Sequence, residues 1–248
     1  MEKSDMIYGT RAVMEAIRAG KEIEKVMVQS GLNNDLVKEL IQLSRRRHIP
    51  VSFVPPEKLK RLSNKNHQGV ICLVSAVNFS KLDNIVQQVF SEGRNPVVLL
   101  LDRITDVRNF GAIVRTAECA GVDAIVIGEK GSAPVTSDAM KTSAGALNHV
   151  PVCRERDLVQ TVRYLRDSGM RIIACTEKTP QEIYRVNLKG PIALILGSEE
   201  DGISDGLLRE ADDLAKIPMR GRIGSLNVSV AAGVAIYEVL RQQSAAGN

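Results

Sequence analysis

Short runs of four to six apolar residues alternate along the chain with segments in which apolar residues recur at helical spacing. This alternation predicts an α/β fold. In the second half the apolar runs are continuous, which is typical of parallel strands buried on both faces. The strands expected there are 97–102, 124–127, 172–176, 192–196 and 214–217, and the helices are 111–120, 137–144, 158–168, 205–211 and 228–243.

The first part of the chain predicts a smaller α/β unit over residues 1–77. Its expected helices are 10–19, 35–47 and 56–62, and its expected strands are 25–29, 51–54 and 70–77. A polar stretch, 78–95, follows with a short amphipathic helix at 82–90 and a cluster of turn residues after it, so it is the predicted linker. Residues 96–248 then form the longer unit.

Composition narrows the class of protein. Hydrophobic residues make up 44% and charged residues 25% of the 248 residues, which fits a folded globular protein. No apolar run approaches the roughly 20 residues of a membrane span. The first 30 residues contain five acidic residues and no apolar segment of the kind found in a secretory signal. We therefore expect a cytoplasmic protein without a membrane partner. The four widely spaced cysteines and three histidines predict reduced thiols and no metal site.

Positive charge is concentrated before residue 91, where the balance is +5 against −1 in the remainder. Between 38 and 65 there are eight basic and two acidic residues, a plausible phosphate-binding surface. The alternative is a set of solvated helix ends. Aromatic residues are only 3%, so a platform of stacked bases is not expected. The candidate RNA-binding residues are Arg45, Arg46, Arg47, Lys58, Lys60, Arg61 and Lys65.

Several common ligand motifs are missing from the sequence. No Gly-x-Gly-x-x-Gly follows the first strand of either unit, and no Gly-x-Ser-x-Gly elbow is present. The segment from Gly197 to Gly202 has P-loop-like glycine spacing but three carboxylates, and Ile203 and Ser204 follow it in place of Lys and Ser/Thr. Nucleotide binding of the Walker and usual Rossmann types is therefore excluded.

Loops after strands remain as the places for chemistry, because open parallel sheets bind ligands beyond the carboxyl ends of their strands. The loop 106–111 leads into a helix that carries Arg115, with Asn109 in position to cap that helix. The loop 196–202 has glycines at both ends of an acidic turn, and taken alone it favours a solvated turn.

The third loop, 217–229, packs two glycines and two arginines between a strand and the last helix. Ser225 and Asn227 are both suited to cap that helix. A helix cap accounts for one of these two residues, but it does not account for two glycines, two arginines and two capping residues within eight positions.

Together, the three loops resemble the three motifs of the SPOUT superfamily, in its SpoU (TrmH-type) branch of RNA 2′-O-ribose methyltransferases. The matching segments are 109–117, 194–203, and 217–219 followed by 225–231. Segments 7–13 and 67–70 resemble the small substrate-binding domain of the branch that methylates a guanosine ribose in 23S ribosomal RNA. The resemblance implies a parallel-sheet, Rossmann-like domain with a carboxyl-terminal trefoil knot, preceded by a small α/β substrate-binding domain. It also implies a homodimer whose active site is shared between protomers.

The implied reaction is methyl transfer from S-adenosyl-L-methionine to a ribose 2′-hydroxyl, with no metal. The implied catalytic set is Asn109, Arg115, Glu199, Ser225 and Asn227. The implied cofactor contacts are Gly197, Ile217 and Leu226, with Thr176, Met219 and Gly221 as weaker candidates.

Arginine does not readily act as a free base, so Arg115 is expected to stabilise the developing alkoxide or to hold the adjacent phosphate. Glu199 is expected either to orient Arg115 or to accept the proton. The alternatives to a ribosomal RNA substrate are the same chemistry on transfer RNA and a non-catalytic RNA-binding protein of ribosome assembly. The complete polar set argues against the non-catalytic protein.

Overall fold

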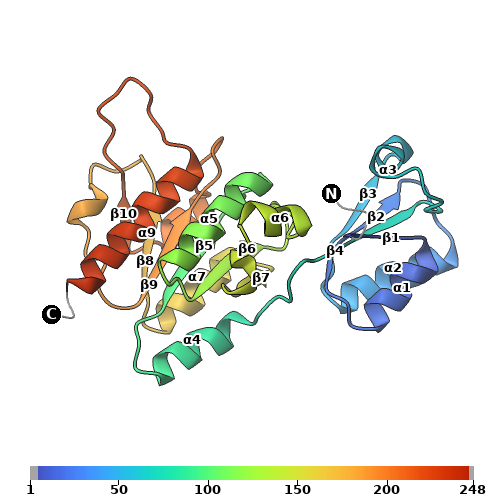
Figure 1. Ribbon diagram of the computed structural model, residues 1–248, viewed down its shortest axis with the longest axis horizontal. Helices are drawn as coiled ribbons and strands as arrows, with labels where there is room; N and C mark the ends of the chain where they lie inside the picture. Colours follow the sequence, from blue (N-terminus) through green and yellow to red (C-terminus); the bar gives the residue numbers. More distant parts are fainter. Residues whose placement is uncertain (1–4, 246–248) are drawn as a thin grey trace. The chain divides into compact units, whose positions relative to one another are not determined.

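The computed structural model describes residues 5–245, and the chain divides into two compact units (Figure 1). The first unit extends to Asn78 and includes Pro134–Ala139, and the second holds the rest. Within residues 5–245 no helix is long and apolar enough to cross a membrane. The same residues contain no group of three or more His, Cys, Asp or Glu side chains arranged to hold a metal ion.

The first unit is a four-stranded sheet with helices on both faces. Its strands are β1 (Met6–Tyr8), β2 (Ile23–Gln29), β3 (Val51–Val54) and β4 (Val70–Val74), in the order β1-β4-β2-β3. The helices α1 (Thr10–Arg18) and α2 (Asp35–Arg46) pack on one face, and α3 (Pro56–Leu62) packs on the other. Strand β1 was not predicted, because three residues are too few to show a pattern.

The second unit is built on a six-stranded parallel sheet. Its strands are β5 (Val97–Leu101), β6 (Ala124–Gly128), β7 (Val152–Glu155), β8 (Arg171–Cys175), β9 (Ile192–Leu196) and β10 (Asp213–Ala215), in the order β10-β8-β9-β5-β6-β7. The predicted α/β class and parallel sheet are confirmed. The four-residue strand β7 was not predicted from the sequence.

Helices cover this sheet and leave the carboxyl ends of its central strands to loops. These helices are α4 (Leu82–Ser91), α5 (Val107–Cys119), α7 (Leu158–Asp167), α8 (Asp205–Glu210) and α9 (Val228–Ser244). The short helix α6 (Ser137–Thr142) is divided between the two units, since Pro134–Ala139 belongs to the first. Apolar residues of α4, α7 and α8 share one core with alternate residues of the strands. Helix α9 packs against α5 and β9 (Figure 1). Because β5 and β9 are neighbours but far apart in the sequence, their carboxyl ends form a switch point of the kind that binds ligands.

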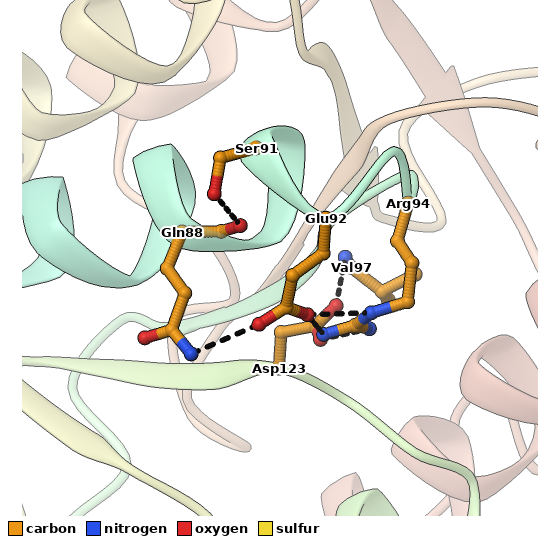
Figure 2. A network of polar contacts seen from close by, with 6 residues as sticks. All are labelled: Gln88, Ser91, Glu92, Arg94, Val97 and Asp123. Atoms are coloured by element: carbon orange, nitrogen blue, oxygen red, sulfur yellow. Dashed lines mark hydrogen bonds and ion pairs between the residues drawn. The ribbon is translucent and has the colours of Figure 1, made fainter.

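The segment predicted as a linker is largely packed against the second unit. Leu82 and Val86 of α4 lie in the core of that unit. After α4, Arg94 bonds both Glu92 and Asp123 at 2.8 Å, and Asp123 also accepts from the backbone N–H of Val97 at 2.9 Å (Figure 2). Hydrogen bonds from Gln88 and Arg94 stabilise the charged form of Glu92 and lower the pKa of its carboxyl group. This network fixes the entry into β5.

The start of α5 differs from the prediction. The helix begins at Val107, and its cap is Asp106, whose side chain accepts from the N–H groups of Arg108 and Asn109 at 2.7 and 3.1 Å. The expectation that Asn109 caps the helix is therefore wrong. Asn109 lies one turn further in, where its side chain is free to reach another loop.

Candidate active site

A pocket of about 740 Å³ opens at the carboxyl ends of β8 and β9 and beside the loop between β10 and α9. Five of the six expected cofactor residues line it: Thr176, Gly197, Ile217, Met219 and Leu226. The sixth, Gly221, is not part of the lining, and a side chain there would meet nothing within 4 Å.

The walls of the pocket combine apolar side chains with unused backbone donors. Leu196, Ile217 and Ala231 contribute apolar surface. Burial raises the pKa of the Cys175 thiol to about 12, so this lining residue is neutral. Among the described residues, the backbone N–H groups of the lining residues Ile217, Met219 and 224–227 donate to no backbone carbonyl. Such a wall suits a ligand with an apolar ring and several acceptors.

Two residues of the pocket lining, Glu199 and Asn227, form a polar cluster with Asn109 of α5. Oε1 of Glu199 accepts from Nδ2 of Asn109 at 3.1 Å, from Nδ2 of Asn227 at 2.6 Å and from the backbone N–H of Val228 at 3.2 Å. The two amides also bond each other, with Nδ2 of Asn227 donating to Oδ1 of Asn109 at 3.1 Å. The first turn of α5, the loop after β9 and the start of α9 are thereby held at one carboxylate.

Local sequence explains why these residues meet. Asn227 caps α9, since its side chain accepts from the N–H of Ser229 at 3.0 Å. Glu199 follows β9 and sits at the amino-terminal end of α9, where the helix dipole favours a negative charge. Of the two predicted caps, Asn227 is therefore the one that starts the helix, and Ser225 is left as an exposed lining residue of the pocket.

Arg115 lies outside this cluster in a single chain. It is exposed on α5, six residues beyond Asn109, which is about one and a half turns. Among the described residues its side chain has no hydrogen-bond or ion-pair partner, so within one chain Glu199 binds the two asparagines and not Arg115. Its positive charge is free to meet a ligand or another chain.

A second network, not foreseen from the sequence, anchors the acidic loop. Arg103 has φ 59° and donates to Asp201 and to the carbonyl of Gly202, both at 3.0 Å. It also contacts Asp102, a buried residue whose Oδ2 accepts from the N–H of Ser204 at 2.7 Å. These bonds fix the loop after β9 to the end of β5. The signal in the sequence is a charged pair directly after an apolar strand.

Gly197 is required by the loop itself. Ser198 and Gly202 exchange backbone hydrogen bonds of 3.2 and 3.0 Å, which closes the loop tightly. A Cβ on Gly197 would lie 2.1 Å from the carbonyl carbon of Gly202. The glycine is therefore needed for closure of the loop, independently of any ligand.

The expected RNA-binding residues lie on the first unit. All seven are exposed side chains without an acidic partner among the described residues: Arg45, Arg46, Arg47, Lys58, Lys60, Arg61 and Lys65. Lys65 lies over the ring of Tyr8, with its Nζ 4.8 Å from the ring centre.

Both units of the chain match known protein families. Residues 96–237 match the SpoU rRNA Methylase family, and residues 6–80 match the family described as RNA 2′-O ribose methyltransferase substrate binding. The first match covers more than half of the chain, and this protein belongs to the SpoU rRNA methylase family. The resemblance seen in the three loops is confirmed.

Individual relatives agree with this assignment. YacO of Bacillus subtilis, assigned to the TrmH family of tRNA/rRNA methyltransferases, is 32% identical over 248 residues, 99% of each chain. A Staphylococcus aureus protein with the same assignment is 37% identical over 244 residues, 98% of each chain.

Solved structures share the fold. An AdoMet-bound rRNA methyltransferase of Sinorhizobium meliloti has a TM-score of 0.60 and 25% identity, covering 96% of this chain and 87% of that one. The SpoU methyltransferase AviRb of Streptomyces viridochromogenes has a TM-score of 0.61 at 21% identity, covering 98% and 90%.

Proposed function

We propose that this protein is an S-adenosylmethionine-dependent RNA 2′-O-ribose methyltransferase that modifies a guanosine of 23S ribosomal RNA. The observation that carries the proposal is the polar cluster in which Glu199 and Asn227, two residues that line the pocket, are hydrogen-bonded to Asn109. A donor pocket beside a fixed polar cluster places two reactants in contact, which is the main requirement of a group transfer.

The chemistry of the pocket fits the methyl donor. When bound, S-adenosylmethionine supplies a sulfonium methyl group whose carbon a ribose oxygen can attack in line, with release of S-adenosylhomocysteine. Leu196, Ile217 and Leu226 would contact the adenine, and the hydroxyl of Thr176 would bond its polar groups. The volume of about 740 Å³ is within the usual range for a small-molecule site. Gly197 and Met219 also line the pocket, and Gly221 lies in the same loop as Met219 without lining it.

The protein's own residues position the acceptor hydroxyl. Glu199 fixes the two asparagine amides, so that they are already oriented when RNA arrives. Ser225 presents a hydroxyl beside them from the pocket wall. Arg115 stabilises the negative charge that develops on the ribose oxygen, or holds the adjacent phosphate.

A second copy of the chain completes the site in this proposal. In one chain Arg115 does not contact the Glu199 cluster, and α9 carries exposed apolar residues on one face: Val230, Tyr237 and Leu240. A homodimer covers this face and supplies Arg115 from the partner. The proposal also includes the trefoil knot that the resemblance implies, formed by the carboxyl-terminal part of the second unit.

Mixing two inactive variants tests the shared site. Arg115→Ala and Glu199→Ala chains are unfolded together and refolded at equal amounts. If each site takes Arg115 from one chain and Glu199 from the other, half of the dimers contain one intact site, and about a quarter of wild-type activity returns. Activity that stays at the level of the single variants would place both residues of a site on one chain. Separately refolded variants are the control.

The substrate is tested with unmodified ribosomal and transfer RNA and labelled S-adenosylmethionine. The proposal predicts label in 23S ribosomal RNA. Label confined to transfer RNA would establish the second candidate function, methylation of transfer RNA. The names of the TrmH-family relatives give transfer RNA and ribosomal RNA side by side. RNA binding and cofactor binding without any label would instead indicate a non-catalytic RNA-binding protein.

A further inference from the structure

Phe53 is the one phenylalanine of four that the described fold leaves in solvent. Its side chain is 58% exposed, the largest exposed fraction of any large apolar residue in the first unit. Phe110 is buried, Phe90 packs against the core of the second unit, and Phe79 lies under the Arg154 guanidinium at 3.6 Å. In a chain with so few aromatic residues, this exposure needs a reason.

The position of Phe53 in the sheet explains why nothing covers it. Strand β3 is at the edge of the four-stranded sheet and pairs only with β2. Phe53 lies opposite Val28, and both Val28 and Val51 pack in the core beneath α1 and α2. The side chain of Phe53 is therefore on the same face of the sheet as that core, but it lies outside the core and is not covered by α1 or α2. Burial of such a side chain would stabilise the fold, and the exposed ring of Phe53 does not contribute this stabilisation.

Unpaired positive charges flank the same strand along the chain. Helix α2 ends in Arg45 and Arg46 just before β3, and α3 carries Lys58, Lys60 and Arg61 just after it. These side chains are exposed and have no acidic partner among the described residues. The only acidic residue from 45 to 65 is Glu57. This charge is complementary to a polyanion and unfavourable for most protein partners.

We infer that Phe53 stacks on an unpaired nucleobase of the RNA substrate, while the cations on either side of β3 bind the flanking phosphates. The inference rests on the proposed function and adds a requirement to it: the RNA presents an unpaired nucleotide to the first unit. Stacking on an aromatic ring needs a free base face, which a duplex does not offer. A single ring in a basic surface is compatible with the low aromatic content of the chain.

Binding of full-length protein to two RNAs tests this inference. One is a hairpin with an unpaired loop, and the other is a blunt duplex of the same length. We expect Phe53→Ala to weaken binding to the hairpin about 10-fold or more and binding to the duplex by less than about 2-fold. Phe53→Tyr keeps the ring and should bind as wild type. Tyr184→Ala removes another half-exposed aromatic, in the second unit, and should leave both affinities unchanged.

The salt dependence separates stacking from phosphate contacts. Phe53→Ala should leave the log–log salt slope unchanged, whereas Lys60→Gln should reduce it by about 0.7 for one phosphate contact on a single strand. Equal affinity of Phe53→Ala and wild type for the hairpin would overturn the inference. So would equal losses on hairpin and duplex, or wild-type protein that binds neither RNA.

Failure of the proposed function would look different. A wild-type protein that binds the hairpin through Phe53 but transfers no methyl group would refute the activity and leave the stacking intact. A protein that methylates RNA with unchanged affinity after Phe53→Ala would refute the stacking alone. Binding of S-adenosylhomocysteine should be the same for wild type and Phe53→Ala in either case.

Discussion

Replacing Glu199 by alanine and by glutamine separates the two roles that its carboxylate can have. Its Oε1 accepts three hydrogen bonds, from Asn109, Asn227 and the N–H of Val228. Glutamine keeps an oxygen that can occupy the same place and accept from the same donors, but it carries no charge and cannot take up a proton. Alanine removes the acceptor completely.

The expected magnitudes follow from these three contacts. A hydrogen bond contributes about 1 kcal/mol net, and water can replace part of the loss because the cluster is exposed. We expect Glu199→Ala to destabilise the second unit by about 1–2 kcal/mol, which lowers its Tm by roughly 2–8 °C. Loss of the oriented amides should lower kcat by about 10²-fold or more. For Glu199→Gln we expect a Tm within about 2 °C of wild type and a kcat within about 10-fold.

The assay is methyl transfer at saturating RNA and cofactor, with thermal unfolding of the same preparations. Both variants should bind S-adenosylhomocysteine within a few-fold of wild type, which shows that the pocket is intact. If Glu199→Gln unfolds like wild type yet is as inactive as Glu199→Ala, the carboxylate accepts the proton and our view of it as an organising residue is wrong.

Other variants test the loops and the division of labour. Arg103→Ala should weaken S-adenosylhomocysteine binding about 10-fold by releasing the acidic loop, and Arg103→Lys should restore only part of it, because an ammonium lacks the planar fork; unchanged affinity in calorimetry would exclude this positioning role. Gly197→Val should abolish binding and lower the Tm, because its side chain would meet the backbone of Gly202, whereas Gly221→Val stands in open space and should be tolerated. A fragment of residues 79–248 should fold and bind S-adenosylhomocysteine but fail to methylate RNA; full activity would show that the first unit is dispensable.

The sequence was sufficient to predict the helices and strands whose apolar pattern extends over many residues. The continuous apolar strands of the second half and the capped helices of the first were placed within a few residues. Strands β1 and β7 were not, because three or four residues carry too little periodicity and form only by pairing with neighbours. The start of α5 was misplaced because Asp106 and Asn109 are both good caps, and only the backbone decides between them.

The site was predicted as a set of residue types rather than as a geometry. Motif resemblance brought Asn109, Glu199 and Asn227 together, but it did not show that the carboxylate binds both amides. It implied an active site shared between two protomers, but it did not show which residue of the set stands apart in one chain. The contacts of Arg103 join residues about one hundred positions apart, so no local pattern could reveal them.

The central claim is that the pocket and its polar cluster transfer a methyl group to a ribose oxygen of RNA. The most direct measurement is the identity of the methylated nucleoside after incubation of the protein with S-adenosylmethionine and unmodified 23S ribosomal RNA, using digestion and mass spectrometry. We predict a single 2′-O-methylguanosine, present with wild type and absent with Glu199→Ala. A methyl group on a base, or none in the presence of bound cofactor and bound RNA, would contradict the account.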